Sequence, residues 1–285
     1  MTYQEWQMTA RNRLRQSGLD ERESALVARK LLDFHTQVAR AALLFPEETV
    51  QNPAELETLL ARLERGEPLP HILRAMPFWE FEFQVSSDTL IPRPETELLV
   101  EAVLERLENR QNPRICDLGT GSGAIAITLA KVRGDAQICA VELCDKARAI
   151  AEQNARQLGA TVQFVAGAPD WFSPLETHFP AHKWDVLVSN PPYIASAEIE
   201  TLATSVREFE PRLALDGGAD GLEPYRVFAA RGRDFLNESG FFALELGARQ
   251  FGDVAQLFRE SGWRVEAPTH DLAGIERVLV AHNTA

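Results

Sequence analysis

The residues best suited to chemistry follow a short apolar stretch, in the sequence Asn190-Pro191-Pro192-Tyr193. Residues 186–189 favour a buried strand, and the prolines end it because neither can donate a ladder hydrogen bond. We therefore expect Asn190 and Tyr193 at the carboxyl end of a strand, where open α/β sheets bind ligands. The segment 190–193 offers two hydrogen-bond acceptors, the Asn190 side-chain oxygen and the Pro191 carbonyl, beside the aromatic ring of Tyr193. A planar group that carries an NH2 would fit such a site, whereas a plain loop turn is the alternative.

A glycine-rich loop at residues 117–123 joins a predicted strand, 114–118, to a predicted helix, 122–132. Its glycines allow a sharp turn and let a ligand approach main-chain atoms. The loop is not followed by Gly-Lys-Ser/Thr, which excludes a nucleoside-triphosphate P-loop. It also contains no Lys or Arg, and it begins with Asp117. An aspartate is a poor neighbour for a pyrophosphate and a good one for a cation.

Glu142 ends the next predicted strand, 136–142, at the position where an acidic residue takes ribose hydroxyls in dinucleotide folds. These features indicate an adenosine-like ligand with positive charge and no phosphates, which describes S-adenosylmethionine. An NAD site is the alternative, and the Asn-Pro-Pro-Tyr sequence counts against it. Trp171 is expected to stack on the adenine, with Asp170 accepting from the adenine amino group. Simple core packing of Trp171 stays open.

The chemistry that these parts predict is methyl transfer to a nitrogen. An amide nitrogen is a poor nucleophile because its lone pair is delocalised into the carbonyl. Two acceptors that hold both N–H bonds would direct the lone pair at a sulfonium methyl group. After transfer the nitrogen loses a proton readily, so no charged general base is required. A glutamine side chain and an adenine amine satisfy this logic equally.

Composition narrows the class of protein. The chain has 285 residues, enough for two domains, with ordinary hydrophobic (45%) and charged (25%) fractions. Its net charge of −13 argues against binding bare nucleic acid through phosphate neutralisation. No run of eighteen apolar residues and no signal-peptide pattern is present, so we expect a cytoplasmic protein.

The cysteines and histidines do not predict a metal site. Cys116, Cys139 and Cys144 lack a C-x-x-C spacing, and the first two fall in predicted buried strands, where a thiol packs as a small hydrophobe. His178 and His182 are four residues apart, but a proline lies between them and no glutamate follows the first, which excludes a zinc helix of the H-E-x-x-H type.

The N-terminal part of the chain predicts a small helical bundle. We expect helices over 3–16, from Asp20 onward with Leu26, Leu31 and Leu32 inward, over 36–44, and from an N-cap at Asn52 to Gly66. A β-hairpin with strands at 72–75 and 80–85 follows, and then a helix that ends near Leu107. The domains expected are 1–70, a helical bundle; 71–93, a hairpin linker; and 94–285, a methyltransferase domain.

From residue 114 strands alternate with helices, which predicts a parallel sheet covered on both faces. The fold class expected is α/β: a doubly wound, seven-stranded Rossmann-like methyltransferase sheet with an antiparallel C-terminal hairpin, plus the N-terminal bundle. The further helices predicted are 145–158, 222–238 and 250–261, and the further strands are 161–166, 184–189, 240–246, 263–267 and 277–282.

Several motifs together resemble one family. They are Leu-Ile-Pro-Arg-Pro-Glu-Thr-Glu (90–97), the glycine loop, Asn-Pro-Pro-Tyr-Ile (190–194), Phe-Glu-Pro-Arg-Leu-Ala-Leu-Asp-Gly-Gly (209–218), Asp-Gly-Leu (220–222) and Asp-Leu-Ala-Gly-Ile-Glu-Arg-Val (271–278). Asn-Pro-Pro-Tyr alone also occurs in DNA and RNA amino-methyltransferases. The combination resembles the HemK/PrmC family, the peptide chain release factor glutamine methyltransferases, over nearly the whole chain.

The resemblance implies a reaction: methylation of the side-chain amide nitrogen of the glutamine in the Gly-Gly-Gln motif of release factors. The implied methyl donor is S-adenosyl-L-methionine and the product S-adenosyl-L-homocysteine. The implied cofactor-binding residues are Gly119, Thr120, Gly121, Ser122, Gly123, Glu142, Trp171 and Asn190. Asn190, Pro191, Pro192 and Tyr193 would bind the glutamine, with Asn190, Pro191 and Tyr193 catalytic. The bundle would dock the release factor, and a monomer without nucleic-acid or membrane contact is expected.

Two details of the resemblance are left open by the sequence. The family usually has Gly-Asp directly after the third strand, whereas here Ala168 and Pro169 separate Gly167 from Asp170, so the alignment of Asp170 and Trp171 with the adenine site is unsettled. For Arg93 and Arg212, structural pairing is favoured over a role in orienting the substrate.

Three other functions compete with this one. They are a glutamine methyltransferase for a ribosomal protein, an adenine-amino nucleic-acid methyltransferase, and a non-enzymatic adaptor with a degenerate methyltransferase fold. The acidic charge and the missing basic patch count against the nucleic-acid enzyme. The adaptor is disfavoured because Asp117, Gly119, Gly121, Glu142 and Asn190 are all intact.

Overall fold

The computed structural model describes residues 1–283. The chain forms two compact units. The helical unit comprises Met1–Ala75 with Ala203–Phe209, and the sheet unit comprises Met76–Leu202 with the chain from Glu210 onward. The chain therefore leaves the sheet unit once to contribute a short segment to the helical unit.

The helical unit is a bundle around a leucine-rich core. Its helices are α1 (Tyr3–Gln16), α2 (Glu21–Thr36), α3 (Ala41–Leu44), α4 (Pro53–Glu64), α5 (Leu69–Leu73) and α10 (Thr204–Arg207). Thr2 and Glu5 form a capping box at the start of α1, and the Asp20 carboxylate accepts from two backbone N–H groups of α2. Leu14, Leu31, Leu32, Leu56 and Leu60 are buried in the core.

Two predictions for the helical unit were wrong. The helix predicted over 36–44 is only α3, because Gln37 and Arg40 adopt left-handed φ values of 55° and 57° that separate it from α2. Leu26 is 42% exposed, since it lies two positions from the buried Ser24 and Ala28 and so on the opposite side of the helix. The N-cap predicted at Asn52 is confirmed, although its side chain makes no cap hydrogen bond.

The hairpin lies further along the chain than predicted. Its strands are β1 (Ala75–Phe78) and β2 (Phe81–Gln84), which form a separate two-stranded sheet. Ile72 belongs instead to α5, where a proline in the first turn supports the helix. Pro77 sits within β1, which a two-stranded sheet tolerates because each strand has an unpaired edge.

The sheet unit contains the doubly wound sheet that the sequence predicts. Its strands are β3 (Arg114–Leu118), β4 (Gln137–Glu142), β5 (Gln163–Ala166), β6 (Trp184–Ser189), β7 (Leu236–Glu245), β8 (Arg264–Val265), β9 (Thr269–His270) and β10 (Glu276–His282). The path through seven strands is β5-β4-β3-β6-β7-β10-β8, with β9 paired to β10. Strands β3 to β7 are parallel, and β10 is antiparallel to β7 and β8. The antiparallel C-terminal strands are confirmed.

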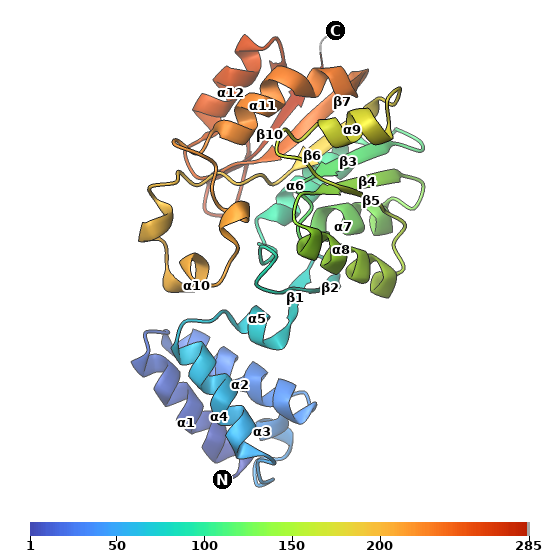
Figure 1. Cartoon of the computed structure of the whole chain (residues 1–285). Coiled ribbons are helices and arrows are strands. Elements are labelled where there is room, and N and C mark those ends of the chain that lie inside the picture. The colour runs from blue at the N-terminus through green and yellow to red at the C-terminus, as the bar shows by residue number, and fades with distance from the viewer. Residues whose placement is uncertain (284–285) are drawn as a thin grey trace. The chain divides into compact units, whose positions relative to one another are not determined.

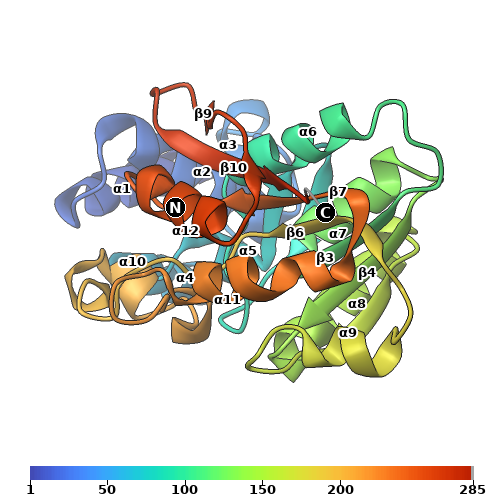
Figure 2. The same cartoon turned by 90° about the horizontal axis from the view of Figure 1, so that it is seen from above.

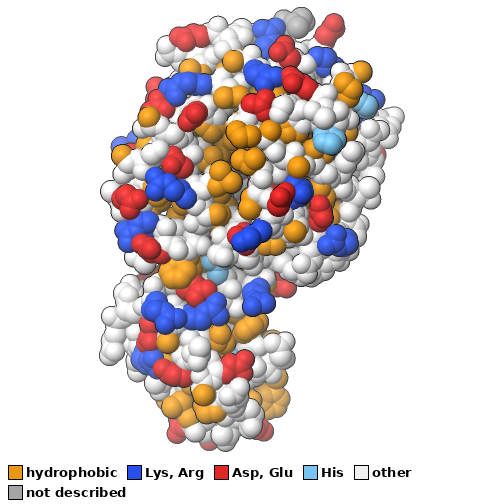
Figure 3. Space-filling view, viewed as in Figure 1, with side chains coloured by type: hydrophobic (Ala, Val, Ile, Leu, Met, Phe, Trp, Pro, Cys, Tyr) orange, Lys and Arg blue, Asp and Glu red, His pale blue; other side chains and the backbone are white. Residues whose placement is uncertain are grey.

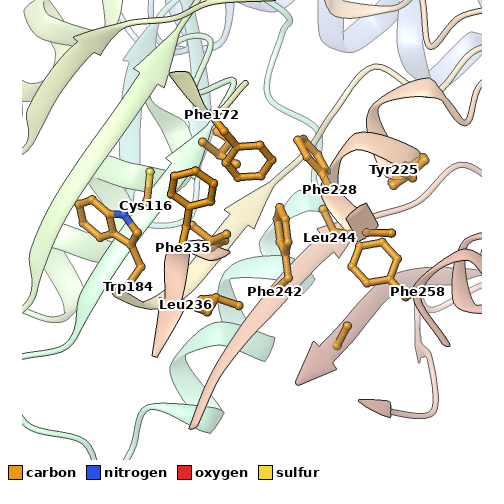
Figure 4. Close-up of a cluster of buried hydrophobic side chains, with 14 of the residues drawn as sticks. Cys116, Phe172, Trp184, Tyr225, Phe228, Phe235, Leu236, Phe242, Leu244 and Phe258 are labelled. Carbon is orange, nitrogen blue, oxygen red and sulfur yellow. The ribbon is translucent and has the colours of Figure 1, made fainter. Parts of the chain in front are cut away.

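Helices cover both faces of this sheet (Figures 1 and 2). They are α6 (Thr96–Arg106), α7 (Ala124–Val132) and α8 (Asp145–Leu158) on one face, and α9 (Ser173–His178), α11 (Glu223–Arg231) and α12 (Phe251–Glu260) on the other. Strand alternation divides the core accordingly: Ile115 packs with the first group. Cys116, Phe242 and Leu244 pack with the second (Figure 4).

One helix of the sheet unit is shorter than predicted. The helix expected over 222–238 ends at Arg231, a 3-10 turn (Gly232–Phe235) follows, and β7 already begins at Leu236. Phe235 stacks on Phe172 with ring centroids 4.6 Å apart. This packing draws the chain into the sheet before a longer helix can form. Helix α9, strand β9 and the 3-10 turns (Ile199–Thr201, Arg212–Ala214) were not predicted.

Candidate active site

A cavity of about 430 Å³ opens at the carboxyl ends of β3, β4 and β6. Its volume falls within the range typical of small-molecule sites. The lining includes most of the glycine loop, residues 119–122, together with Glu142, Trp171, Asn190 and Pro192. The structure therefore brings together the segments that the sequence singled out separately.

The glycine loop is held from beneath by a buried carboxyl group. Asp117 is fully buried; its Oδ2 accepts from Thr120 Oγ1 (2.6 Å) and from the Ala126 N–H (3.2 Å). Its Oδ1 has no hydrogen-bond partner among the described residues. Burial raises the pKa of Asp117 to about 7. A charge at this position is costly in the ligand-free protein and would be favoured by a nearby cation.

The glycines serve close packing as well as ligand access. Gly119 has φ +80°, and a Cβ placed there would meet Trp171 Cζ3 at 3.1 Å. Gly123 caps α7 with φ +86°, and its Cβ would come within 2.6 Å of Ile127. Gly123 lies behind the cavity lining, so its observed contacts explain the glycine through packing alone.

Trp171 contacts both the cavity and the core. It lines the cavity, and its ring meets Phe228 edge-on at 4.9 Å between centroids. Its backbone is left-handed, with φ 67°, a conformation that costs a non-glycine residue energy. Both interpretations from the sequence, stacking on a ligand and packing in the core, are compatible with this position.

Glu142 closes the opposite side of the loop. Its two carboxylate oxygens accept from the backbone N–H groups of Gly121 (2.8 Å) and Cys144 (2.9 Å), and burial raises its pKa. Gly167 passes so close that a Cβ would meet the Leu143 nitrogen at 2.6 Å. The carboxylate is thus held by main-chain groups at the edge of the cavity.

Asp170 does not share this position. Its carboxylate accepts from Ser173 Oγ (2.7 Å) and from Arg231 Nη1 (3.1 Å), and its pKa is lowered, first by the Ser173 hydrogen bond. The neighbouring residues Ala168 and Pro169, not Asp170, line the cavity. These contacts give Asp170 a structural role in the ligand-free protein.

Asn190 stands directly after β6, where the sequence predicts it. Its Nδ2 donates to Thr96 Oγ1 over 3.2 Å, and its Oδ1 is buried without a partner among the described residues. The Thr96 hydroxyl in turn donates to Glu245 Oε2 over 2.6 Å. Leaving a buried acceptor unpaired costs about 1–3 kcal/mol, so Asn190 carries an acceptor that an incoming N–H group would satisfy.

Tyr193 is fixed by its backbone as much as by its ring. Its carbonyl accepts from Gln250 Nε2 over 2.9 Å, and the ring packs against the core cluster under α11 and α12. Burial and the Glu245 carboxylate raise the Tyr193 pKa to about 12. The phenol is therefore neutral at ordinary pH. Pro191 is buried, and Pro192 reaches the cavity lining.

The arginines left open by the sequence both have carboxylate partners. Arg93 pairs with buried Glu210, whose other oxygen accepts from the Ile91 N–H over 3.1 Å. Arg212 contacts Glu200 (3.3 Å) and Asp216 (3.2 Å) and is largely exposed. Arg93 also lines the cavity, so its pairing fixes a wall of the site.

The sequence interpretation missed Thr96, Glu245 and Gln250. The sequence did contain one signal for Glu245, which is the acidic last residue of an apolar strand. Glu142 has the same position in β4, and Asp117 is the last residue but one of β3. A carboxylate at the carboxyl end of a buried parallel strand is expected to face the ligand edge of the sheet. Thr96 lies in the 90–97 motif, but nothing there assigned it a role, and nothing in the local sequence marked Gln250; the partners of both residues are distant in the chain.

The fold and site define a Rossmann-like methyltransferase, the class that uses S-adenosylmethionine. A family model described as "Methyltransferase small domain" matches residues 94–217, and one described as "PrmC N-terminal domain" matches residues 5–73. The chain is 40% identical to the release factor glutamine methyltransferase of Rhodospirillum rubrum over 278 residues, covering 96% of this chain and 82% of that protein. The enzyme of the same name from Neisseria gonorrhoeae is 40% identical, covering 89% and 91%. The chain belongs to the release factor glutamine methyltransferase family.

Solved structures agree on the fold. A methyltransferase from Pyrococcus furiosus aligns with a TM-score of 0.53 at 14% identity, over 80% of this chain and all of that one. The hMettl16 catalytic domain, solved with an RNA hairpin, aligns with a TM-score of 0.56 at 17% identity, over 70% of this chain and 74% of that one. At such identities the likeness concerns the fold alone.

Proposed function

We propose that this protein methylates the side-chain amide nitrogen of the glutamine in the Gly-Gly-Gln motif of peptide chain release factors, with S-adenosyl-L-methionine as methyl donor. The observation that carries the proposal is the buried Asn190 Oδ1 at the carboxyl end of β6, which has no hydrogen-bond partner within residues 1–283, in a chain of this family. An amide NH2 is the simplest group that would satisfy that acceptor.

The cavity suits the cofactor in size and in charge. Glu142 would hold the ribose hydroxyls, the glycine loop would lie along the cofactor backbone, and Trp171 would cover the adenine. When bound, S-adenosylmethionine supplies a methyl group on a positively charged sulfur. The buried carboxyl groups of Asp117 and Glu142 favour a cation in this part of the sheet unit. Burial raises the pKa of both groups, and the charge of Arg148 offsets this only in part for Glu142.

The chain's own residues orient the glutamine. Asn190 Oδ1 would accept one N–H of the amide and the Pro191 carbonyl the other, which turns the nitrogen lone pair toward the methyl group. The same acceptors stabilise the positive charge that grows on nitrogen. Tyr193, neutral with a pKa of about 12, is no base at neutral pH and serves by packing.

The proposed division of labour follows the domain bounds expected from the sequence. The bundle, 1–70, docks the release factor; the hairpin segment, 71–93, connects; and 94–285 carries the reaction, in a cytoplasmic monomer without direct nucleic-acid contact. The helical unit carries exposed apolar side chains, which support a protein-docking role. No helix within residues 1–283 is long and apolar enough to cross a membrane.

Transfer of labelled methyl groups tests the proposal. The protein is incubated with labelled S-adenosylmethionine and a bacterial release factor, either wild type or with the Gly-Gly-Gln glutamine changed to alanine. We expect label on the wild-type factor and none on the variant. Label that persists on the variant, or that appears on a ribosomal protein or on RNA instead, would refute the substrate.

A further inference from the structure

Three side chains from three elements meet at the cavity: Asn190 after β6 and Thr96 at the start of α6, which line it, and Glu245 at the end of β7, which does not. The parallel register pairs Ser189 with Leu244, so Asn190 and Glu245 follow side by side at the carboxyl edge of the sheet. Strand alternation turns Glu245 to the α6 face, since Phe241 and Ala243 pack there. The topology therefore brings the carboxyl group to the N-terminus of α6.

Two hydrogen bonds join the three groups in series. Asn190 Nδ2 lies 3.2 Å from Thr96 Oγ1, and Thr96 Oγ1 lies 2.6 Å from Glu245 Oε2. Thr96 is 4% exposed and Glu245 is 2% exposed. Water competes little for these partners. Whether each group donates or accepts is therefore decided by the groups next to it.

We propose, on the basis of the proposed function, that the Thr96–Glu245 pair is a positioning device that decides which end of the Asn190 carboxamide receives the substrate. A carboxylate only accepts hydrogen bonds, so the Thr96 hydroxyl donates its single hydrogen to Glu245. The Thr96 oxygen then has only lone pairs for Asn190, which must present its NH2. Oδ1 is left for the amide of the substrate.

The reverse arrangement would block the reaction. If Thr96 donated to Asn190, the carboxamide would turn by 180° and present its NH2 to the NH2 of the glutamine. Two donors would then face each other, and the acceptor on which the mechanism depends would be lost. Without the Thr96 hydroxyl, only the smaller direct interaction between the Asn190 amide and Glu245 is left to select an orientation.

Protonation of Glu245 reverses the direction of donation in the hydrogen bonds that join Glu245, Thr96 and Asn190. Its surroundings contain Arg277, Glu95, Tyr193 and the Tyr225 hydroxyl, which donates to the Glu245 carbonyl over 2.8 Å. Burial, with repulsion from Glu95, raises the Glu245 pKa to about 7, although the hydrogen bonds from Thr96 and Asn190 and the charge of Arg277 lower it. Protonated Glu245 can donate to Thr96, which frees the Thr96 hydrogen for Asn190. The active polarity therefore requires pH above about 7.

Substitution at Thr96 separates positioning from folding. Thr96→Val keeps the shape and removes the hydroxyl; we expect kcat to fall about 10- to 100-fold, as for other groups that orient a primary ligand, with S-adenosylmethionine affinity nearly unchanged. Thr96→Ser should retain wild-type turnover. Thr128→Val is the matched control, because Thr128 is equally buried and its hydroxyl has no partner among the described residues.

The pH profile and an equilibrium measurement complete the test. Wild-type kcat should rise about tenfold per pH unit below pH 7 and level off above it, following one titrating group, while Glu245→Gln should be slow and nearly independent of pH from 6 to 8. The affinity for the release factor in the presence of S-adenosylhomocysteine should follow the same profile. Should Glu245→Gln not fold, the wild-type profile and the Thr96 pair decide.

Two failures are distinguishable. If the wild-type protein labels no release factor, the proposed function is wrong. If it labels the factor while Thr96→Val keeps full kcat, or while Thr96→Ser is as slow as Thr96→Val, the positioning role is overturned and the proposed function stands.

Discussion

Asn190 Oδ1 and Asp117 Oδ1 are buried oxygens without a hydrogen-bond partner among the described residues, and both lie at the carboxyl edge of the sheet. Each costs folding free energy, about 1–3 kcal/mol for an unsatisfied polar group. Within the described residues, neither oxygen makes a hydrogen bond that would offset this cost in the ligand-free protein. Their positions, one beside the cavity and one under its glycine loop, connect both costs to ligand binding.

The first prediction concerns Asn190. Asn190→Ala removes the acceptor, so kcat should fall about 10²- to 10³-fold, the usual loss for one preorganised polar group. Cofactor affinity, measured by calorimetry, should change far less, because the glycine loop and Glu142 are intact. Exposed Asn109 provides the control variant Asn109→Ala. Turnover at the wild-type rate in Asn190→Ala would contradict the two-acceptor mechanism.

A second prediction follows from the buried carboxyl groups. Asp117 and Glu245 both have pKa values raised to about 7 by burial, so between pH 5 and 7 the folded protein holds protons that the unfolded chain has released. The free energy of unfolding should therefore decrease as pH rises through this window, by up to about 1.4 kcal/mol per pH unit for each group.

Denaturant unfolding at several pH values measures this dependence. In Asp117→Asn the free energy of unfolding should depend less steeply on pH, because one of the two titrating carboxyl groups is gone. The exposed control Asp253→Asn should leave this dependence unchanged. A saturating concentration of S-adenosylmethionine should also flatten the wild-type slope, because the cation favours the ionised carboxylate. A slope that Asp117→Asn does not alter would show that Asp117 is ionised in the ligand-free protein.

At the scale of elements, the loop at 216–221 supports the Asn-Pro-Pro-Tyr segment. Ile194 and Asp216 form a parallel bridge, and a Cβ on Gly217 would meet the Pro192 carbonyl at 2.8 Å. A Cβ on Gly221, at φ +74°, would overlap the Tyr193 carbonyl oxygen. The two glycines thus let one backbone lie directly against the other.

The third prediction uses this contact. Gly221→Ala should displace the Tyr193 backbone and lower kcat by more than about tenfold, since small misplacements of reacting groups are costly. Gly274→Ala is a matched control: its φ of +78° is similar, and no atom of the part of the chain that the structure describes lies within 4 Å of the new Cβ. Both variants bear the strain of a positive φ, so melting temperatures should fall in both and turnover in only one. Equal turnover would contradict the supporting role of the loop.

The sequence predicted elements well where local signals agree with packing. Strand β6 and helix α8 have the expected bounds, because an apolar run and an amphipathic pattern each continue to a clear stop. The hairpin failed because Met76-Pro77-Phe78 reads as a turn, whereas the pairing of β1 with β2 places the turn at Trp79, with φ 56°. Helix α11 ended early because Phe235 is drawn into the core, a tertiary effect without a local signal.

The site was predictable in part for the same reason. Gly119, Glu142 and Asn190 each end or follow a strand, so the rule for parallel sheets places them at one edge. Thr96 and Glu245 are 149 residues apart and meet through one hydrogen bond. Such a pairing depends on strand order and register, which the alternation of helices and strands does not specify.

At the scale of the whole chain, charge argues for a protein substrate. The net charge is −13, and on the face drawn in Figure 3 acidic and basic side chains are interspersed, with apolar side chains grouped in the middle of the sheet unit. A surface of this kind gives little of the phosphate neutralisation on which nucleic-acid binding depends. Recognition through apolar contacts is the expected alternative.

The last prediction concerns docking by the helical unit. Leu43 and Leu44 end α3, Phe45 follows it, and the three are 72%, 59% and 48% exposed. Three consecutive large apolar side chains in water are typical of a partner surface. Leu44→Ser should therefore raise KM for the release factor about fivefold or more, the effect of losing roughly 1 kcal/mol of contact.

Because the reacting groups belong to the sheet unit, Leu44→Ser should leave kcat and S-adenosylmethionine affinity unchanged, and its stability should change by less than about 0.5 kcal/mol, as for most surface substitutions. Leu272→Ser is the matched control, since Leu272 is fully exposed on the sheet unit. If KM responds to Leu272→Ser and not to Leu44→Ser, the sheet unit alone recognises the release factor. A fall in kcat for Leu44→Ser with an unchanged KM would assign the apolar segment to catalysis rather than docking.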